Sequence, residues 1–290
     1  MITFYQSLID GLGNGGVYAL LALALVLVYR SGSLVNLAQG EMAMFSAYAY
    51  LALTRAGVQT TFAVAVAIVI SFGAGLLIER LLLRRLAGNA FALMLMTLAL
   101  FVGIDALVGF IWSDQPNKLP KLFGSDMLRF AGVGISVETQ GTLAVLAGLA
   151  AVLYLLNRYT RLGLAMRAAA SNPEAAALLG LRGGTLLGIG FGLAAGFGCL
   201  AGVIASSRLS LDPSVMQVVL VFAIAAATVG GLDSPLGAII AGLLLGIIES
   251  LAATYLLSPG LRIGVPLVLI IVVLAFRPTG LFGSLRWGRA

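Results

Sequence analysis

The chain has 290 residues, of which 61% are hydrophobic and only 10% are charged, and its mean hydropathy is +1.09. A soluble domain carries about 25% charged residues, so a fold of this composition has too little polar surface to cover itself in water. Histidine is absent, and the single cysteine, Cys199, lies in an apolar run, which excludes a disulfide framework and removes the commonest metal ligand. The net charge of +6 comes from arginines scattered between apolar runs. The composition predicts a multi-pass membrane protein in contact with lipid, with no metal, cofactor or nucleic-acid partner.

Nine apolar stretches follow one another along the chain. A bilayer core about 30 Å thick needs about 20 apolar residues per helix, and the stretches are close to that length: 8–29, 36–53, 60–78, 90–112, 140–156, 184–206, 215–231, 236–257 and 263–276. Two of them, 36–53 and 215–231, are short and adjoin polar residues, as broken or re-entrant helices do. We therefore predict an all-α membrane protein, a single transmembrane domain over residues 1–290 with about eight or nine transmembrane helices.

The basic residues predict the orientation of these helices. Eleven of the seventeen fall in loops that alternate spans would place on one side: Arg30, Arg80, Arg84, Arg85, Arg158, Arg161, Arg167, Arg182, Arg277, Arg286 and Arg289. The other side holds six: Arg55, Lys118, Lys121, Arg129, Arg208 and Arg262. Since cytoplasmic loops carry the excess of Lys and Arg, we expect 157–183 and the C-terminus in the cytoplasm and, with nine full spans, the N-terminus outside.

The two halves of the chain resemble each other weakly. Each has a Gly-rich span, then a polar break (Leu34-Val35-Asn36 or Leu211-Asp212-Pro213), then a short helix of small residues. Inverted repeats with broken helices are a frequent transporter design. Spans rich in Gly, Ala and Leu also look alike by chance, so the sequence leaves the repeat open.

The segment 158–182 is too charged to cross a membrane and too long for an ordinary loop between helices, which takes about 2–8 residues. It contains a short predicted helix, Pro173 to Leu179, with Ser171 or Asn172 as its cap, proline at its first position and Gly180 closing it. A rod of about 10 Å cannot span a bilayer. It could rest on the lipid surface, with Arg161 and Arg167 binding headgroups, or it could dock into a cytoplasmic partner. The residues alone leave both readings open.

A family resemblance favours docking. The pattern Arg161-Leu162-Gly163, Met166-Arg167-Ala168, Asn172-Pro173-Glu174-Ala175-Ala176 and Leu179-Gly180 resembles the cytoplasmic coupling loop of ABC-importer permeases. More narrowly, it is similar to the LivH-type inner-membrane permeases of branched-chain amino acid importers. Three further stretches match in order: Gly15 to Leu20, Val35 to Met42 and Gly230 to Ala238. Gln39 departs from the family, which commonly has histidine there.

The resemblance implies a transport subunit of the bacterial inner membrane that is not itself an enzyme. It would pair with a second permease, with two cytoplasmic ABC ATPase subunits and with a periplasmic substrate-binding protein, and it would form half of a pathway for branched-chain or related hydrophobic amino acids. The chain has no GxxxxGK[ST] phosphate loop of its own. The residues expected to couple to the ATPase are Arg161, Gly163, Arg167, Asn172, Pro173, Glu174, Ala175, Ala176 and Gly180. Alternatives are cargo such as urea, short amides or other small acids, and a proton- or sodium-coupled secondary transporter that works alone.

Two other groups of residues are candidates for function. Asn36, Gln39 and Glu41 begin a span, where they could line the translocation path or its gate, or could only cap a helix and favour its dipole. Gly184, Gly188, Gly192 and Gly196 recur every four residues, a ridge that predicts close helix packing. That ridge is either an ordinary seam or a surface that slides during transport. Asp105 and Glu249 lie within other spans, where we expect structural polar contacts.

Overall fold

The computed structural model describes residues 2–86, 88–112, 115–124, 126–130, 133–171, 173–180, 183–256, 258 and 261–283. Within these ranges the first helices are α1 (Ile2–Gly32), α2 (Gln39–Arg55), α3 (Thr60–Leu81), the 3-10 turn η1 (Leu83–Leu86) and α4 (Ala90–Trp112). A hairpin, β1 (Met127–Phe130) and β2 (Val133–Ser136), precedes α5 (Val137–Tyr159), α6 (Arg161–Ser171) and α7 (Pro173–Leu178). The last four are α8 (Gly183–Leu209), α9 (Val215–Gly230), α10 (Pro235–Tyr255) and α11 (Gly264–Phe276).

Each of the nine apolar stretches coincides with one of these helices, so the predicted helical membrane fold is confirmed. Among the described residues, six helices are long and apolar enough to cross a membrane: α1, α3 with η1, α4, α5, α8 and α10. The helices α9 and α11 are apolar but shorter, and α2 has 17 residues. At about 1.5 Å per residue, α2 and α9 are each roughly 25 Å long, less than the core of a bilayer. These short helices are the reason why the number of spans is approximate.

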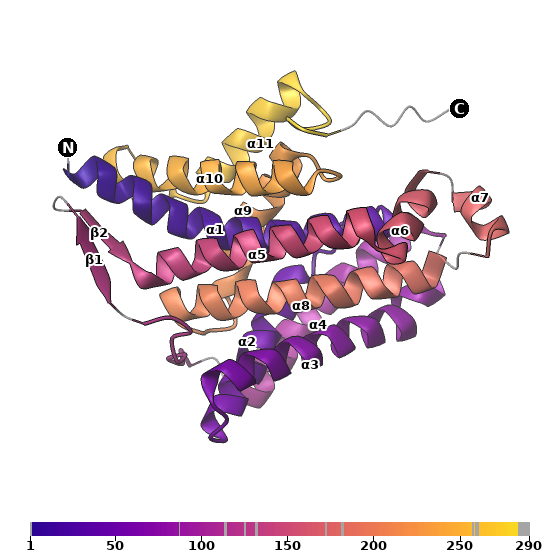
Figure 1. The fold of residues 1–290 in the computed structure, drawn as a ribbon, viewed down its shortest axis with the longest axis horizontal. Helices are drawn as coiled ribbons and strands as arrows, with labels where there is room; N and C mark the ends of the chain where they lie inside the picture. Colours follow the sequence, from indigo (N-terminus) through magenta and orange to yellow (C-terminus); the bar gives the residue numbers. More distant parts are fainter. Residues whose placement is uncertain are drawn as a thin grey trace.

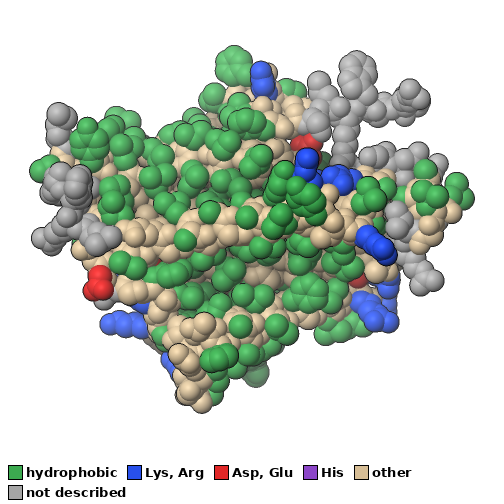
Figure 2. Space-filling view, in the orientation of Figure 1, with side chains coloured by type: hydrophobic (Ala, Val, Ile, Leu, Met, Phe, Trp, Pro, Cys, Tyr) green, Lys and Arg blue, Asp and Glu red, His purple; other side chains and the backbone are tan. Residues whose placement is uncertain are grey.

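The helices α1 and α8 form the centre of the bundle (Figure 1). Of their most apolar windows, 89% and 83% are buried inside the protein, against 17% for α4. A helix that is apolar on all sides is covered either by protein or by lipid, so α1 and α8 are core helices and α4 is peripheral. Figure 2 shows hydrophobic side chains over most of the visible face, with Lys and Arg gathered mainly beside α6 and α7. This distribution is the one that a lipid-facing surface requires.

Each half of the chain packs its long helix against the shorter helices of the other half, an arrangement that we call an exchange of long helices. The helix α1 packs against α9 and α10, whereas α8 packs against α2 and α3, and both long helices contact each other. The outer contacts correspond as well, because α4 packs on α2 as α11 packs on α9. The short helices begin close together, with Gly40 of α2 against Met216 and Leu220 of α9. This is the packing that two inverted repeats, α1–α4 and α8–α11, would have.

The bundle has two distinct ends. At one, which we call the hairpin end, the antiparallel strands β1 and β2 lie beside the start of α1, and Gln6 exchanges hydrogen bonds of 3.0 and 3.1 Å with the backbone of Gly134. At the other, the α7 end, lie α6, α7, the end of α1 and the start of α8. The segment after α11 returns to this end, where the Leu281 amide donates to the Val229 carbonyl at 2.8 Å. The last described residues, up to Gly283, therefore lie on the same side as α7.

Candidate functional site

The segment predicted to couple begins with a helix that the sequence analysis did not predict, α6. The Thr160 hydroxyl accepts a hydrogen bond of 3.1 Å from the Gly163 amide, which caps the first turn. Gly163 is buried, and a Cβ there would lie 2.7 Å from the carbonyl oxygen of Asn157, so only glycine fits this corner between α5 and α6. Met166 is buried against the core. The corner fixes α6 to the bundle, while Arg161 and Arg167 lie on its exposed side.

The helix α7 projects beyond the bundle (Figure 1). Its bounds match the predicted helix to within one residue, and Gly180 closes it at φ +81°, as a left-handed cap requires. Ala176 is buried, Ala175 is exposed, and Leu178 and Leu179 are 89% and 80% exposed. Asn172 and the side chains of Pro173 and Glu174 lie outside the described part of the chain. The end of α7 and the turn after it therefore expose two adjacent leucines at the tip of this segment.

The polar residues predicted to line the path or its gate lie buried at and just before the start of α2. Asn36, Gln39 and Glu41 are fully buried. The Asn36 amide donates to Gln39 Oε1 at 3.0 Å, and Gln39 Nε2 donates to the Ala194 carbonyl at 2.9 Å, which ties the start of α2 to the middle of α8. Both carboxylate oxygens of Glu41 are buried without a hydrogen bond of ordinary geometry among the described residues.

The four glycines of the predicted ridge face α3 and the turn η1 that follows it. A Cβ at Gly184 would meet Arg84, at Gly188 the Glu79 carboxylate, at Gly192 the ring and backbone of Phe72, and at Gly196 the side chain of Ile68. Gly198 and Gly202 face α2 instead. The ridge is thus a seam between the two halves of the chain, with side chains of α3 lying over the glycines of α8.

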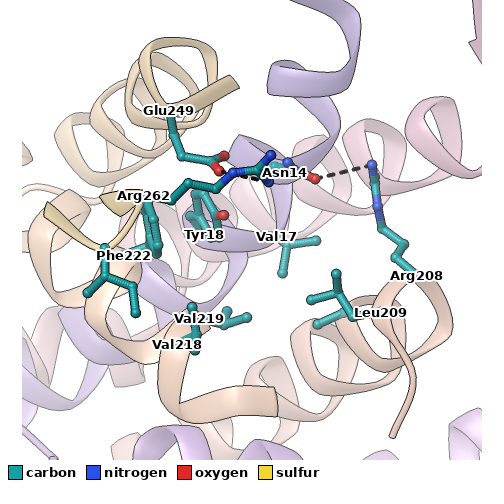
Figure 3. A pocket seen from close by; sticks show the side chains of 12 residues that line it. Asn14, Val17, Tyr18, Arg208, Leu209, Val218, Val219, Phe222, Glu249 and Arg262 are labelled. Atoms are coloured by element: carbon teal, nitrogen blue, oxygen red, sulfur yellow. Dashed lines mark hydrogen bonds and ion pairs between the residues drawn. The ribbon is translucent and has the colours of Figure 1, made fainter. Parts of the chain in front are cut away.

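A cavity of about 270 Å³ opens near the hairpin end (Figure 3). Five helices or their ends form it: Asn14, Val17 and Tyr18 come from α1, Ala205, Arg208 and Leu209 from α8, Val218, Val219 and Phe222 from α9, Glu249 from α10, and Arg262 and Ile263 from the start of α11. The rings of Tyr18 and Phe222 stack with centroids 4.5 Å apart. The cavity therefore has an apolar, partly aromatic wall and three charged side chains.

The charged groups of this cavity are incompletely paired. Arg208 Nη2 donates to Asn14 Oδ1 at 3.3 Å, whereas Nη1 is buried and has no hydrogen-bond partner among the described residues. Glu249 is 95% buried; its Oε1 lies 4.0 Å from the half-exposed Arg262, and its Oε2 accepts no hydrogen bond of ordinary geometry in the described structure, although Asn14 is a polar neighbour. Buried charges are costly unless they are paired. The cavity therefore holds a cationic donor and a carboxylate acceptor that lack full hydrogen bonding of ordinary geometry among the described residues.

A second cavity, of about 160 Å³, lies between α2, α3, α4 and α8. Its walls include Met42, Phe45, Ile78 and Ala195, and none of its lining residues is charged. Among the described residues no group of three or more Cys, Asp or Glu is placed to hold a metal ion. Of these two cavities, the one near the hairpin end has the charged lining residues.

Comparison with known proteins agrees with the resemblance read from the sequence. The model of a family described as branched-chain amino acid transport system / permease component matches residues 7–274. The chain belongs to this family. It is 30% identical over 297 residues to the high-affinity branched-chain amino acid transport system permease protein LivH of Escherichia coli, covering 97% of this chain and 96% of that one. The permease protein BraD of Pseudomonas aeruginosa is 28% identical over the same shares.

A more distant relative and one solved structure complete the comparison. A probable branched-chain amino acid transport permease protein LivH of Methanocaldococcus jannaschii is 28% identical over 91% of this chain and 88% of its own. A chain of PsaBC from Streptococcus pneumoniae in complex with Fab covers 94% of this permease and 91% of its own length at a TM-score of 0.48 and 12% identity, too distant to bear on the fold.

The sequence analysis placed the expected coupling residues in one segment, which the structure folds as α6 and α7, but it missed the cavity. Arg208 and Arg262 were read only as topology signals, and Glu249 as a structural contact. The signal was present, because Asn14, Arg208 and Glu249 are polar residues in or at the end of otherwise apolar helices, and an ionisable residue at membrane depth is by default a functional candidate. The sequence does not show that α1, α8 and α10, which carry these residues, meet at one cavity.

Proposed function

We propose that this permease forms half of the translocation pathway of an ATP-driven importer for branched-chain or related hydrophobic amino acids. Its partners would be a second permease subunit, two ABC ATPase subunits that hydrolyse ATP, and a periplasmic substrate-binding protein. Membership of the permease family supports this proposal, as does the absence of a phosphate-binding loop in the sequence. The whole chain would act as one transmembrane domain, 1–290.

The observation that carries the proposal is the exposed tip of α7. Leu178 and Leu179 would be costly in water, and a partner cleft would cover them. The same end holds the start of α8, whose glycine seam leads into the core. A push on α6 and α7 by the ATPase would therefore reach α5 through the corner that Gly163 packs, and α1 and α8 through their own contacts with α6.

The orientation follows from this assignment. If the ATPase docks at α7, the α7 end and the C-terminus face the cytoplasm, and the hairpin end faces the binding protein. The distribution of arginines supports the same orientation through the positive-inside rule. The chain would lie in the bacterial inner membrane with its N-terminus outside.

Docking can be tested with charge substitutions at the α7 tip. We expect Leu178→Asp, and separately Glu174→Arg, to reduce co-purification of the ATPase subunits at least tenfold while the permease still inserts into the membrane. Leu256→Asp is the matched control, because Leu256 is 82% exposed but lies at the end of α10, near the hairpin end. Full ATPase retention by both α7 variants would contradict the coupling assignment.

Reconstituted uptake separates the proposal from its rivals. Uptake that requires ATP, the ATPase subunits and the binding protein excludes a proton- or sodium-coupled transporter that works alone. The same assay with leucine, urea, acetamide and small carboxylic acids identifies the cargo. Uptake driven by an ion gradient without the ATPase would overturn the proposed function.

A further inference from the structure

We propose that the cavity near the hairpin end is a binding site for one zwitterionic α-amino acid in transit, with the amino acid carboxylate on Arg208 and Asn14 and its ammonium group on Glu249. The inference deepens the proposed function, on which it rests for the role of the site. It names a place for the cargo inside this chain, apart from any binding protein.

The charges of the cavity match the two ends of such a ligand. Arg208 Nη1 is buried without an acceptor, and Glu249 Oε2 is buried without a donor of ordinary geometry among the described residues. An arginine fork binds a carboxylate through two N–H groups, and one of the two here is already open. Figure 3 shows Asn14 between Arg208 and Glu249, with its side-chain oxygen accepting from Arg208. A zwitterion would fill both vacant positions at once and add no net charge.

The approach of Arg208 to this position depends on a glycine. A Cβ at Gly13 would lie 2.6 Å from both terminal nitrogens of Arg208. The guanidinium therefore lies directly over the backbone of α1, one residue before Asn14. Because the helix leaves room there, the side chain reaches from the end of α8 across to α1 instead of extending into solvent.

The rest of the wall suits an apolar side chain. Val17, Val219 and the stacked rings of Tyr18 and Phe222 line the cavity. Its volume of about 270 Å³ is close to the lower limit of small-molecule sites, about 300 Å³. A ligand of the size of leucine fits this description better than a peptide or a sugar does. Arg262, which is half exposed, lies beside Glu249 at the mouth, where an arriving ammonium group would compete with it.

The test uses the purified importer complex, without its binding protein, in detergent free of phosphatidylethanolamine. Radiolabelled leucine is displaced with leucine, with 4-methylpentanoate, which lacks the amine, and with 3-methylbutylamine, which lacks the carboxylate. We expect each truncated analogue to compete about tenfold to a hundredfold more weakly, the effect of losing one hydrogen bond to a buried charge. Equal competition by all three, or no leucine binding at millimolar concentration, would overturn the proposal. The second result is also expected if a lipid headgroup, which carries the same two charges, is the true occupant.

Substitutions then assign the two ends. Glu249→Gln should lose leucine binding and keep binding of 4-methylpentanoate, whereas Arg208→Gln should lose both and Arg208→Lys should recover part of each. Arg55→Gln and Glu138→Gln are matched controls, because both side chains lie toward the hairpin end outside the cavity. If a variant fails to fold, competition by the leucine analogues on the unaltered complex still tests the proposed site.

Measurements of uptake distinguish a failure of this inference from a failure of the proposed function. If ATP-driven leucine import is unaffected by Glu249→Gln and Arg208→Gln, the proposed binding site is wrong, but the proposed importer function stands. If the unaltered complex shows no ATP-driven amino acid uptake, the proposed importer function is wrong, whatever the binding data show.

Discussion

The two central helices occupy equivalent places in the exchanged halves, yet they pack differently. On α1, Gly11 and Gly15 lie against the backbone of α10, and Gly246 of α10 lies against both of them. On α8, the glycines lie mostly under side chains of α3, such as Phe72 and Glu79. Backbone atoms cannot move aside, whereas the ends of side chains can. The first seam is therefore fixed. The second can adapt where side chains cover the glycines of α8, but not where Gly75 of α3 closely approaches the backbone of Phe191 and Gly192.

The cavities beside these helices differ in the same way. The one beside α1 holds Asn14, Arg208 and Glu249, while the one beside α8 has no charged lining residue. Glu79 is the buried carboxylate of α3, but it lies over Gly188 and not in the second cavity. The repeated architecture thus produces a cavity in each half, and a few side chains decide which one can bind a polar ligand.

The largest effect is expected for Gly246→Ala, which tests the fixed seam. Its Cβ would contact the backbone of Gly11 and Gly15, where nothing can yield. Overpacking usually costs about 1–3 kcal/mol, and here we expect more than about 3. The yield of folded protein and its unfolding temperature in detergent measure the effect. Gly73→Ala, which meets no atom within 4 Å, is the control and should be neutral.

A smaller effect, on transport alone, is expected when the charged cavity is filled. Val218 lines that cavity and is 44% exposed, so Val218→Trp has room for the ring without distorting the core. We expect ATP-driven uptake to fall at least tenfold, with the unfolding temperature almost unchanged.

The matched substitution fills the apolar cavity instead. Ala74→Leu adds apolar atoms there and should leave uptake unchanged, with stability equal or higher by about 1 kcal/mol. Similar uptake by the two cavity variants would contradict the functional distinction between the halves.

The smallest effect is expected for Gly188→Ala, which tests the adaptable seam. Its Cβ would lie 2.7 Å from the Glu79 carboxylate, which can shift, and no backbone of another element is near. The cost should be roughly 1 kcal/mol or less, at the low end for overpacking. A loss as large as that of Gly246→Ala, measured in the same unfolding assay, would show that the two seams are alike.

The sequence was sufficient for the nine apolar helices and for α7, because apolar runs and caps are local properties. The predicted rod closed by Gly180 is α7, and the polar breaks after α1 and α8 do precede the short helices α2 and α9. Helix α6 and the β1–β2 hairpin were missed, since neither has a long apolar period. The cavity was missed for another reason: Asn14, Arg208 and Glu249 are far apart in the chain, and apolar helices carry little information about which faces meet.

The bare tip of α7 also bears on how the subunit is made. In the proposed assembly, a copy without its partners would present Leu178 and Leu179 to water, and exposed apolar surface of this kind promotes self-association. Subunits without their partners would then be prone to aggregation and to degradation by proteases. Synthesis in step with the companion proteins would protect the chain, because assembly itself would hide the surface that marks it as incomplete.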